Sequence, residues 1–202
     1  MAKILIVYYS MYGSTYELAK SIEVGAKAAG AEVRIRQVPD HIPESVWKNM
    51  KGVPEAKALQ ASVPVATNDD MMWADGIIFG SPTRFGNMAG QMKNFLDQTG
   101  GLWFKGALDG KVAAFFTGAA TIHGGHETTI LTMSTYAYHH GMTIVTNGYT
   151  LPESGSTTSG GGPYGPSHYG QQGKRSGLDN DEKTIAENIG KRVAMTAKKL
   201  FG

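Results

Sequence analysis

The feature that most constrains this chain is an apolar run that leads through a hydroxyl-rich turn into a helical pattern. Residues 4–9 are typical of a buried strand, residues 10–15 form the turn, and helical spacing opens at Glu17. In such units the unpaired N–H groups of the first helical turn, and the positive end of the helix dipole, face the preceding turn. Serine and threonine hydroxyls can add further donors. The turn is therefore a candidate anion site.

The composition of the turn narrows the choice of anion. It contains no lysine, which excludes the G-x-x-x-x-G-K-[ST] loop of nucleoside triphosphatases, and it lacks the G-x-G-x-x-G of dinucleotide-binding turns. Neutral donors suit one terminal phosphate monoester, which flavin mononucleotide (FMN) carries. The alternative is an ordinary turn in which Ser14 and Glu17 form a capping box. The turn alone does not decide between these interpretations.

The rest of the chain alternates apolar strands with helical patterns, which is typical of a parallel sheet covered on both faces. We predict strands at residues 3–9, 32–38, 76–80, 111–117 and 142–149. The main helices are predicted at about 15–29 and 88–98, before residue 140, and after a capping box of Asp179 and Glu182. Short helices are predicted near 44–51 and 69–74, whereas Trp103 falls in a short loop.

The polarity of the strands predicts their order. The second strand is half polar and belongs at an edge, whereas the first is apolar enough for the middle. We expect one α/β domain over residues 1–202, with a flavodoxin-like, doubly wound, five-stranded parallel sheet in the order 2-1-3-4-5. In that fold the ligand binds where the strand order reverses. The loops after strands one, three and four should therefore form the site.

Composition excludes several classes of protein. Nineteen Lys and Arg against seventeen Asp and Glu give a net charge of +2, too balanced to indicate a nucleic-acid partner. The absence of cysteine excludes disulfides and thiolate chemistry, and no apolar run approaches the roughly 20 residues of a membrane span. With no signal peptide ahead of the first strand, we expect a cytoplasmic protein without membrane insertion. His123, His126 and Glu127 lack further ligands nearby, so no metal site is predicted.

The glycine-rich segment 151–178 is too long for a simple connection, so we expect it to be functional or mobile. Within it, residues 160–165 fit G-x-G-x-x-G letter by letter. Pro163 and Pro166 prevent a helix from starting there, so we interpret this match as a loop.

Six segments spread over most of the chain carry a family resemblance. They are Tyr8–Gly13, Ile77–Met88, Gly90–Met92, Phe95–Trp103, His139–Met142 and Gly162–Gly165. Together they resemble the WrbA family, tetrameric FMN-dependent NAD(P)H:quinone oxidoreductases of the flavodoxin-like superfamily. The resemblance implies FMN as cofactor, NADH or NADPH as hydride donor, a small-molecule quinone as substrate, and a homotetramer.

The resemblance also implies roles for individual residues. The phosphate would be held by Ser10, Met11, Tyr12, Gly13, Ser14 and Thr15. The flavin ring would be bordered by Pro82, Thr83, Arg84, Phe85 and Gly86, and its polar edge by Thr117, Gly118, Ala119, Ala120, Thr121, Gly124 and Gly125. His140 would lie beside the ring as the catalytic residue, because imidazole can exchange a proton near neutral pH. Tyr12, Trp103 and Tyr149 would contact substrates, with Trp103 reaching the pocket of a neighbouring subunit.

The expected activity is two-electron reduction of quinones to hydroquinones, which protects against redox cycling. Two flat substrates that alternate over one flavin face would give ping-pong kinetics. One alternative is a one-electron carrier like a true flavodoxin, although a net charge of +2 does not supply the acidic face that such carriers use for docking. Another is a non-catalytic FMN-binding module. The choice between NADH and NADPH, and the physiological quinone, stay open.

Overall fold

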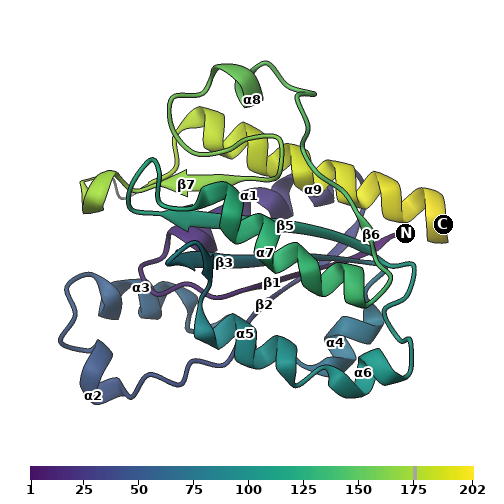
Figure 1. The fold of residues 1–202 in the computed structure, drawn as a ribbon, viewed down its shortest axis with the longest axis horizontal. Helices are drawn as coiled ribbons and strands as arrows, with labels where there is room; N and C mark the ends of the chain where they lie inside the picture. Colours follow the sequence, from purple (N-terminus) through teal and green to yellow (C-terminus); the bar gives the residue numbers. More distant parts are fainter. Residues whose placement is uncertain (175–176) are drawn as a thin grey trace.

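The central sheet of the computed structural model has the order β2-β1-β3-β5-β6, and these strands run parallel (Figure 1). Their bounds are β1 (Lys3–Tyr8), β2 (Glu32–Gln37), β3 (Gly76–Arg84), β5 (Val112–Ala119) and β6 (Thr143–Ile144). The structure describes residues 1–174 and 177–202, so residues 175–176 of the predicted glycine-rich loop lie outside it. The predicted α/β fold and the order 2-1-3-4-5 of the main strands are confirmed, with β2 half-buried at the edge.

Two short strands extend this sheet where its strands end. β4 (Asn87–Met88) pairs antiparallel with the end of β3, and β7 (Ser167–Tyr169) pairs parallel with the end of β5. The predicted fifth strand over 142–149 was wrong beyond Ile144. β6 pairs with the beginning of β5, and β7 takes the place beside its end. The predicted loop 151–178 therefore contains a strand that completes the sheet.

Alternating strand residues face two separate cores. α1 (Ser14–Ala28) and α9 (Asn180–Phe201) cover one face, where they pack on Ile4 and Ile6. α5 (Gly90–Asp97) and α7 (His126–His139) cover the other, together with α4 (Asn68–Trp73) and α6 (Gly100–Phe104), and pack on Leu5 and Val7. The remaining helical segments are α2 (Glu44–Trp47), α3 (Val53–Gln60), α8 (Glu153–Ser156) and the 3-10 turn η1 (Gln171–Gly173).

Local signals at the helix ends explain several boundaries. α1 ends at Ala28, and Gly30 follows with a φ of 81°, as a residue just past a helix end often does. α9 begins with the predicted capping box of Asp179 and Glu182, which is confirmed. Trp103 was wrongly placed in a loop, since it lies in the short helix α6. None of the helices in the described part of the chain has the length and apolar character needed to cross a membrane.

Candidate functional site

The turn between β1 and α1 leaves the start of the helix open. Gly13 is the N-cap residue with a φ of 93°, and its N–H donates to the Ser10 hydroxyl oxygen at 3.1 Å. No side chain among the described residues caps α1, so the alternative of a capping box between Ser14 and Glu17 is wrong. The first-turn N–H groups and the positive end of the helix dipole are therefore available to an anion.

A cleft of about 430 Å³ opens at the carboxyl ends of the strands, beside the start of α1. This volume is within the usual range for a cofactor site. It is bounded by the turn after β1, the end of β3, the end of β5 and the segment around β7. The structure brings together eight residues predicted from the sequence: Tyr12, Ser14, Pro82, Thr83, Arg84, Gly118, Ala119 and Ala120. It adds three lining residues that the sequence did not predict: His168, Gly170 and Gly173.

A tight hairpin holds an aromatic ring out from the edge of the cleft. β3 and β4 are joined by Phe85 and Gly86, which both have positive φ (55° and 78°), as in the two-residue turns that join twisted strands. The Thr83 hydroxyl oxygen accepts from Gly86 N–H at 3.2 Å and from the Thr129 hydroxyl at 3.0 Å. Phe85 is fully exposed despite being large and apolar. Such a residue at strained backbone is a candidate stacking surface for a flat ligand.

Several other predicted residues support the cleft from behind. Met11 and Thr15 are buried, and the Thr117 hydroxyl donates to the Ser81 carbonyl at 2.7 Å. Thr121, Gly124 and Gly125 fold the loop after β5 back onto the protein. A Cβ placed on Gly125 would lie 2.8 Å from the Cα of Gly86, so this loop packs directly against the β3–β4 hairpin.

His126 holds the same loop in place through a hydrogen bond, and its burial makes the stability of the protein sensitive to acid. Its Nε2 donates to the Thr121 carbonyl at 3.2 Å, and its buried Nδ1 lacks a hydrogen-bond partner within the described residues. Burial lowers the pKa of His126 below its usual 6.5, although the Thr121 carbonyl opposes the shift. The unfolded chain therefore binds more protons near and below pH 6.5, so the free energy of unfolding decreases as the pH is lowered.

We expect His126→Gln to lessen the loss of unfolding free energy between pH 7 and 5, measured by urea denaturation. An unchanged pH profile would contradict this.

Three predicted residues do not lie at the cleft within one chain. His140 follows α7, whose 14 residues span about 21 Å, and the cleft lies at the other end of that helix. The Gly141 carbonyl accepts from Gly110 N–H just before β5 begins, so His140 lies at the opposite edge of the sheet. Trp103, in α6, belongs to that edge as well. Tyr149 lies near α8, since Gly155 is its neighbour. Within one chain, therefore, His140 does not border the cleft, and its role beside the ring stays a prediction.

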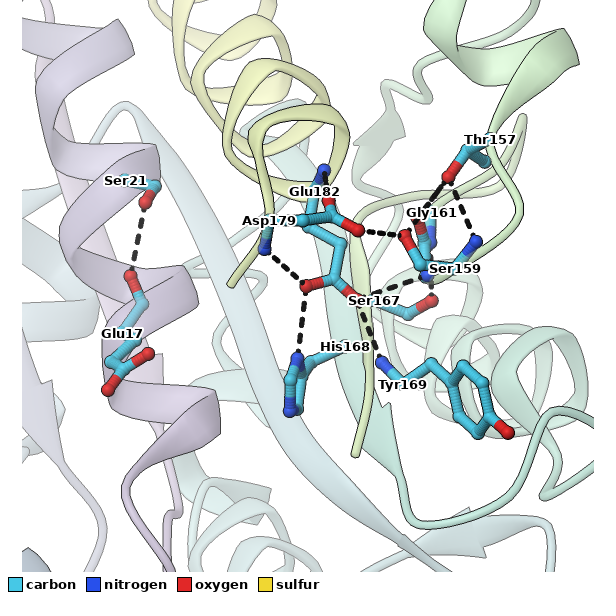
Figure 2. Close-up of polar contacts among 11 residues, drawn as sticks. Glu17, Ser21, Thr157, Ser159, Gly161, Ser167, His168, Tyr169, Asp179 and Glu182 are labelled. Carbon is cyan, nitrogen blue, oxygen red and sulfur yellow. Dashed lines mark hydrogen bonds and ion pairs between the residues drawn. The ribbon is translucent and has the colours of Figure 1, made fainter. Parts of the chain in front are cut away.

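His168, one of the three lining residues that the sequence did not predict, belongs to a buried polar cluster (Figure 2). Glu182 is fully buried, and one carboxylate oxygen accepts from Gly160 N–H at 3.1 Å and Tyr169 N–H at 2.9 Å. The other accepts from Asp179 N–H at 3.2 Å and from His168 Nδ1 at 3.0 Å. Glu182 was predicted as a helix cap, but no periodic pattern marks β7, so its histidine carried no signal.

No group of three or more metal-ligating side chains forms within residues 1–174 and 177–202. The cleft therefore offers main-chain N–H groups, hydroxyls, one arginine and one histidine, flanked by exposed Tyr12 and Phe85. Such a set of hydrogen-bond donors, one of them cationic, and of flat apolar faces can bind an anionic group at one end and an aromatic ring at the other.

Comparison with known proteins places the chain in a family. The family model "NADPH-dependent FMN reductase" matches residues 2–155. An NAD(P)H dehydrogenase (quinone) from Geotalea daltonii is 48% identical over 202 residues, which cover 98% of both chains. Another, from Geobacter sulfurreducens, is 48% identical over 205 residues, 98% of this chain and 99% of its own. The flavodoxin, WrbA-like protein from Agrobacterium tumefaciens has the same fold, with a TM-score of 0.67, 23% identity and 99% coverage of both chains.

Proposed function

Because this chain belongs to the NADPH-dependent FMN reductase family, together with relatives named NAD(P)H dehydrogenase (quinone), we propose that it is an FMN-dependent NAD(P)H:quinone oxidoreductase. The membership and the names of these relatives agree with the resemblance to NAD(P)H:quinone oxidoreductases that the sequence carries. The observation that carries the proposal is the uncapped start of α1 at the end of a cleft of cofactor size.

The residues of the cleft fit FMN. A phosphate monoester needs several N–H and O–H donors, which the first turn of α1 and the Ser14 hydroxyl supply. A flavin ring needs apolar faces and main-chain donors at its polar edge, which Pro82, the hairpin and the start of the loop after β5 supply. A bound FMN would supply hydride and two-electron chemistry, with the overall balance that NAD(P)H, H⁺ and quinone give NAD(P)⁺ and hydroquinone.

The protein contributes binding, orientation and access. Main-chain N–H groups at the β5 and β3 ends can stabilise negative charge at the polar edge of the ring, without reorganisation. Tyr12, which lines the cleft, and Phe85, which follows the lining residue Arg84, are exposed and offer faces on which flat substrates can stack. One open cleft that both substrates must enter supports a ping-pong mechanism, in which the oxidised nucleotide leaves before the quinone binds. Reducing quinones by two electrons in one reaction protects against redox cycling.

We expect purified protein reconstituted with FMN to oxidise NADH or NADPH in the presence of benzoquinone. Varying both substrates should give parallel double-reciprocal lines, because the two ligands occupy the same place in turn. Comparing the rates with NADH and with NADPH at equal concentration shows which nucleotide the protein prefers. Protein that holds FMN but oxidises neither nucleotide with any quinone would contradict the enzymatic proposal and favour a binding module. Intersecting lines would contradict the shared cleft.

We further propose that the chain assembles as a homotetramer in the cytoplasm. Trp103 and Phe104 are exposed large apolar side chains at the edge opposite the cleft, and they offer a surface for a second copy. In that arrangement Trp103 reaches the cleft of a neighbouring subunit. Light scattering should give the mass of four chains.

A further inference from the structure

His168 borders the same end of the cleft as the start of α1. It pairs with Gly118 across the ladder between β7 and β5. The His168 Cβ and the Ser14 hydroxyl oxygen each lie 3.7 Å from the position that a Cβ on Gly118 would occupy. His168 and the first residue of α1 therefore both adjoin Gly118 and line the same cleft, and His168 as a whole is 3% exposed.

The two ring nitrogens of His168 have different surroundings. Nδ1 donates to Glu182, whose carboxylate is fixed by N–H donors from three other residues, so the ring has one defined orientation. Figure 2 shows the second nitrogen on the side of the ring away from Glu182. In the described part of the chain, Nε2 has no hydrogen-bond partner. It lies 3.7 Å from where a Cβ on Gly170 would be, and Gly170 also lines the cleft.

We propose that His168, positioned by Glu182, donates a hydrogen bond from Nε2 to the phosphate monoester of the flavin nucleotide. This inference rests on the proposed function and adds to it a residue that selects FMN over riboflavin. Because Nδ1 already donates to Glu182, Nε2 carries a hydrogen when the ring is an imidazolium. That cation stands between the Glu182 carboxylate and the phosphate, and charge-assisted bonds of this kind are stronger than neutral ones.

The test measures dissociation constants for FMN and riboflavin by quenching of flavin fluorescence, with wild-type protein and His168→Ala, His168→Gln and His41→Gln variants. His41 is exposed and lies far along the chain, so its variant is the matched control. We expect His168→Ala to weaken FMN about 10- to 100-fold and to change riboflavin less than about twofold. His168→Gln should lose less FMN affinity than His168→Ala, since the glutamine amide retains a neutral hydrogen-bond donor.

The outcomes separate the two proposals. Wild-type protein that binds neither flavin would contradict the proposed function, and the inference with it. FMN binding that is unaffected in His168→Ala, or that weakens in parallel with riboflavin, would contradict the inference and leave the function standing. Glu182→Gln should reduce the preference for FMN as His168→Gln does. If that variant fails to fold, the His168 variants still decide.

Discussion

A Ser14→Asp variant is expected to lose FMN binding while its fold becomes no less stable. Ser14 is the first residue of α1, where a carboxylate interacts favourably with the helix dipole, by about 0.3–1 kcal/mol. The same carboxylate would stand beside the phosphate of FMN. Two unit charges about 4 Å apart near a protein surface repel by about 4 kcal/mol, which corresponds to roughly 1000-fold in affinity. Calorimetric titration with FMN measures the loss, and thermal unfolding measures stability.

Ser14→Asn is the matched control for this charge. Asn has the shape of Asp without its charge, so the variant should keep most of the affinity for FMN. Riboflavin lacks the phosphate and should bind all three proteins to a similar degree. If Ser14→Asp bound FMN as tightly as Ser14→Asn does, the start of α1 would not be the phosphate site, and the cleft would need another explanation.

The elements that were predicted from the sequence are those whose cause is local. β1 is a run of apolar residues, α9 begins with a capping box, and Gly30 follows α1, and each of these signals lies within a few neighbouring residues. β7 has no such signal. It is a strand of three residues, and it forms because β5 extends past the end of β6 and leaves its N–H and C=O groups without a partner strand.

The site shows the same division. Ser14 follows β1, and Thr83 and Gly118 lie at the carboxyl ends of β3 and β5. Because parallel strands end on a common side of the sheet, the meeting of these residues could be predicted. His140 could not be placed by its sequence neighbours, because α7 carries it to the opposite edge of the sheet. His168 reaches the cleft through strand pairing and a buried carboxylate 14 residues further along. The positions of His140 and His168 both depend on how the elements pack in three dimensions, and short sequence patterns do not specify that packing.

Gly25→Ala and Gly190→Ala are each expected to destabilise the protein strongly. α1 and α9 cross so closely that a Cβ on Gly25 would lie 1.8 Å from the Glu187 carbonyl oxygen, and one on Gly190 would lie 2.1 Å from the Ile22 carbonyl oxygen. Backbone atoms cannot rotate aside as side chains do, so the helices must separate. Each variant should lose about 3 kcal/mol, or about 6–12 °C in melting temperature.

Gly90→Ala is the control, since Gly90 also lies in a helix and a Cβ there would meet nothing within 4 Å. It should be close to neutral, because Gly90 is the first residue of α5, where the preference of alanine for helix counts for less than in the helix interior. The double variant Gly25→Ala/Gly190→Ala should lose less than the sum of the single losses, since one separation of the helices relieves both clashes. Strict additivity, or single variants as stable as Gly90→Ala, would contradict the close approach. Because α1 also presents the anion turn, added FMN should raise the melting temperature of both single variants, and at saturating FMN the stabilisation grows with the logarithm of the affinity that each retains.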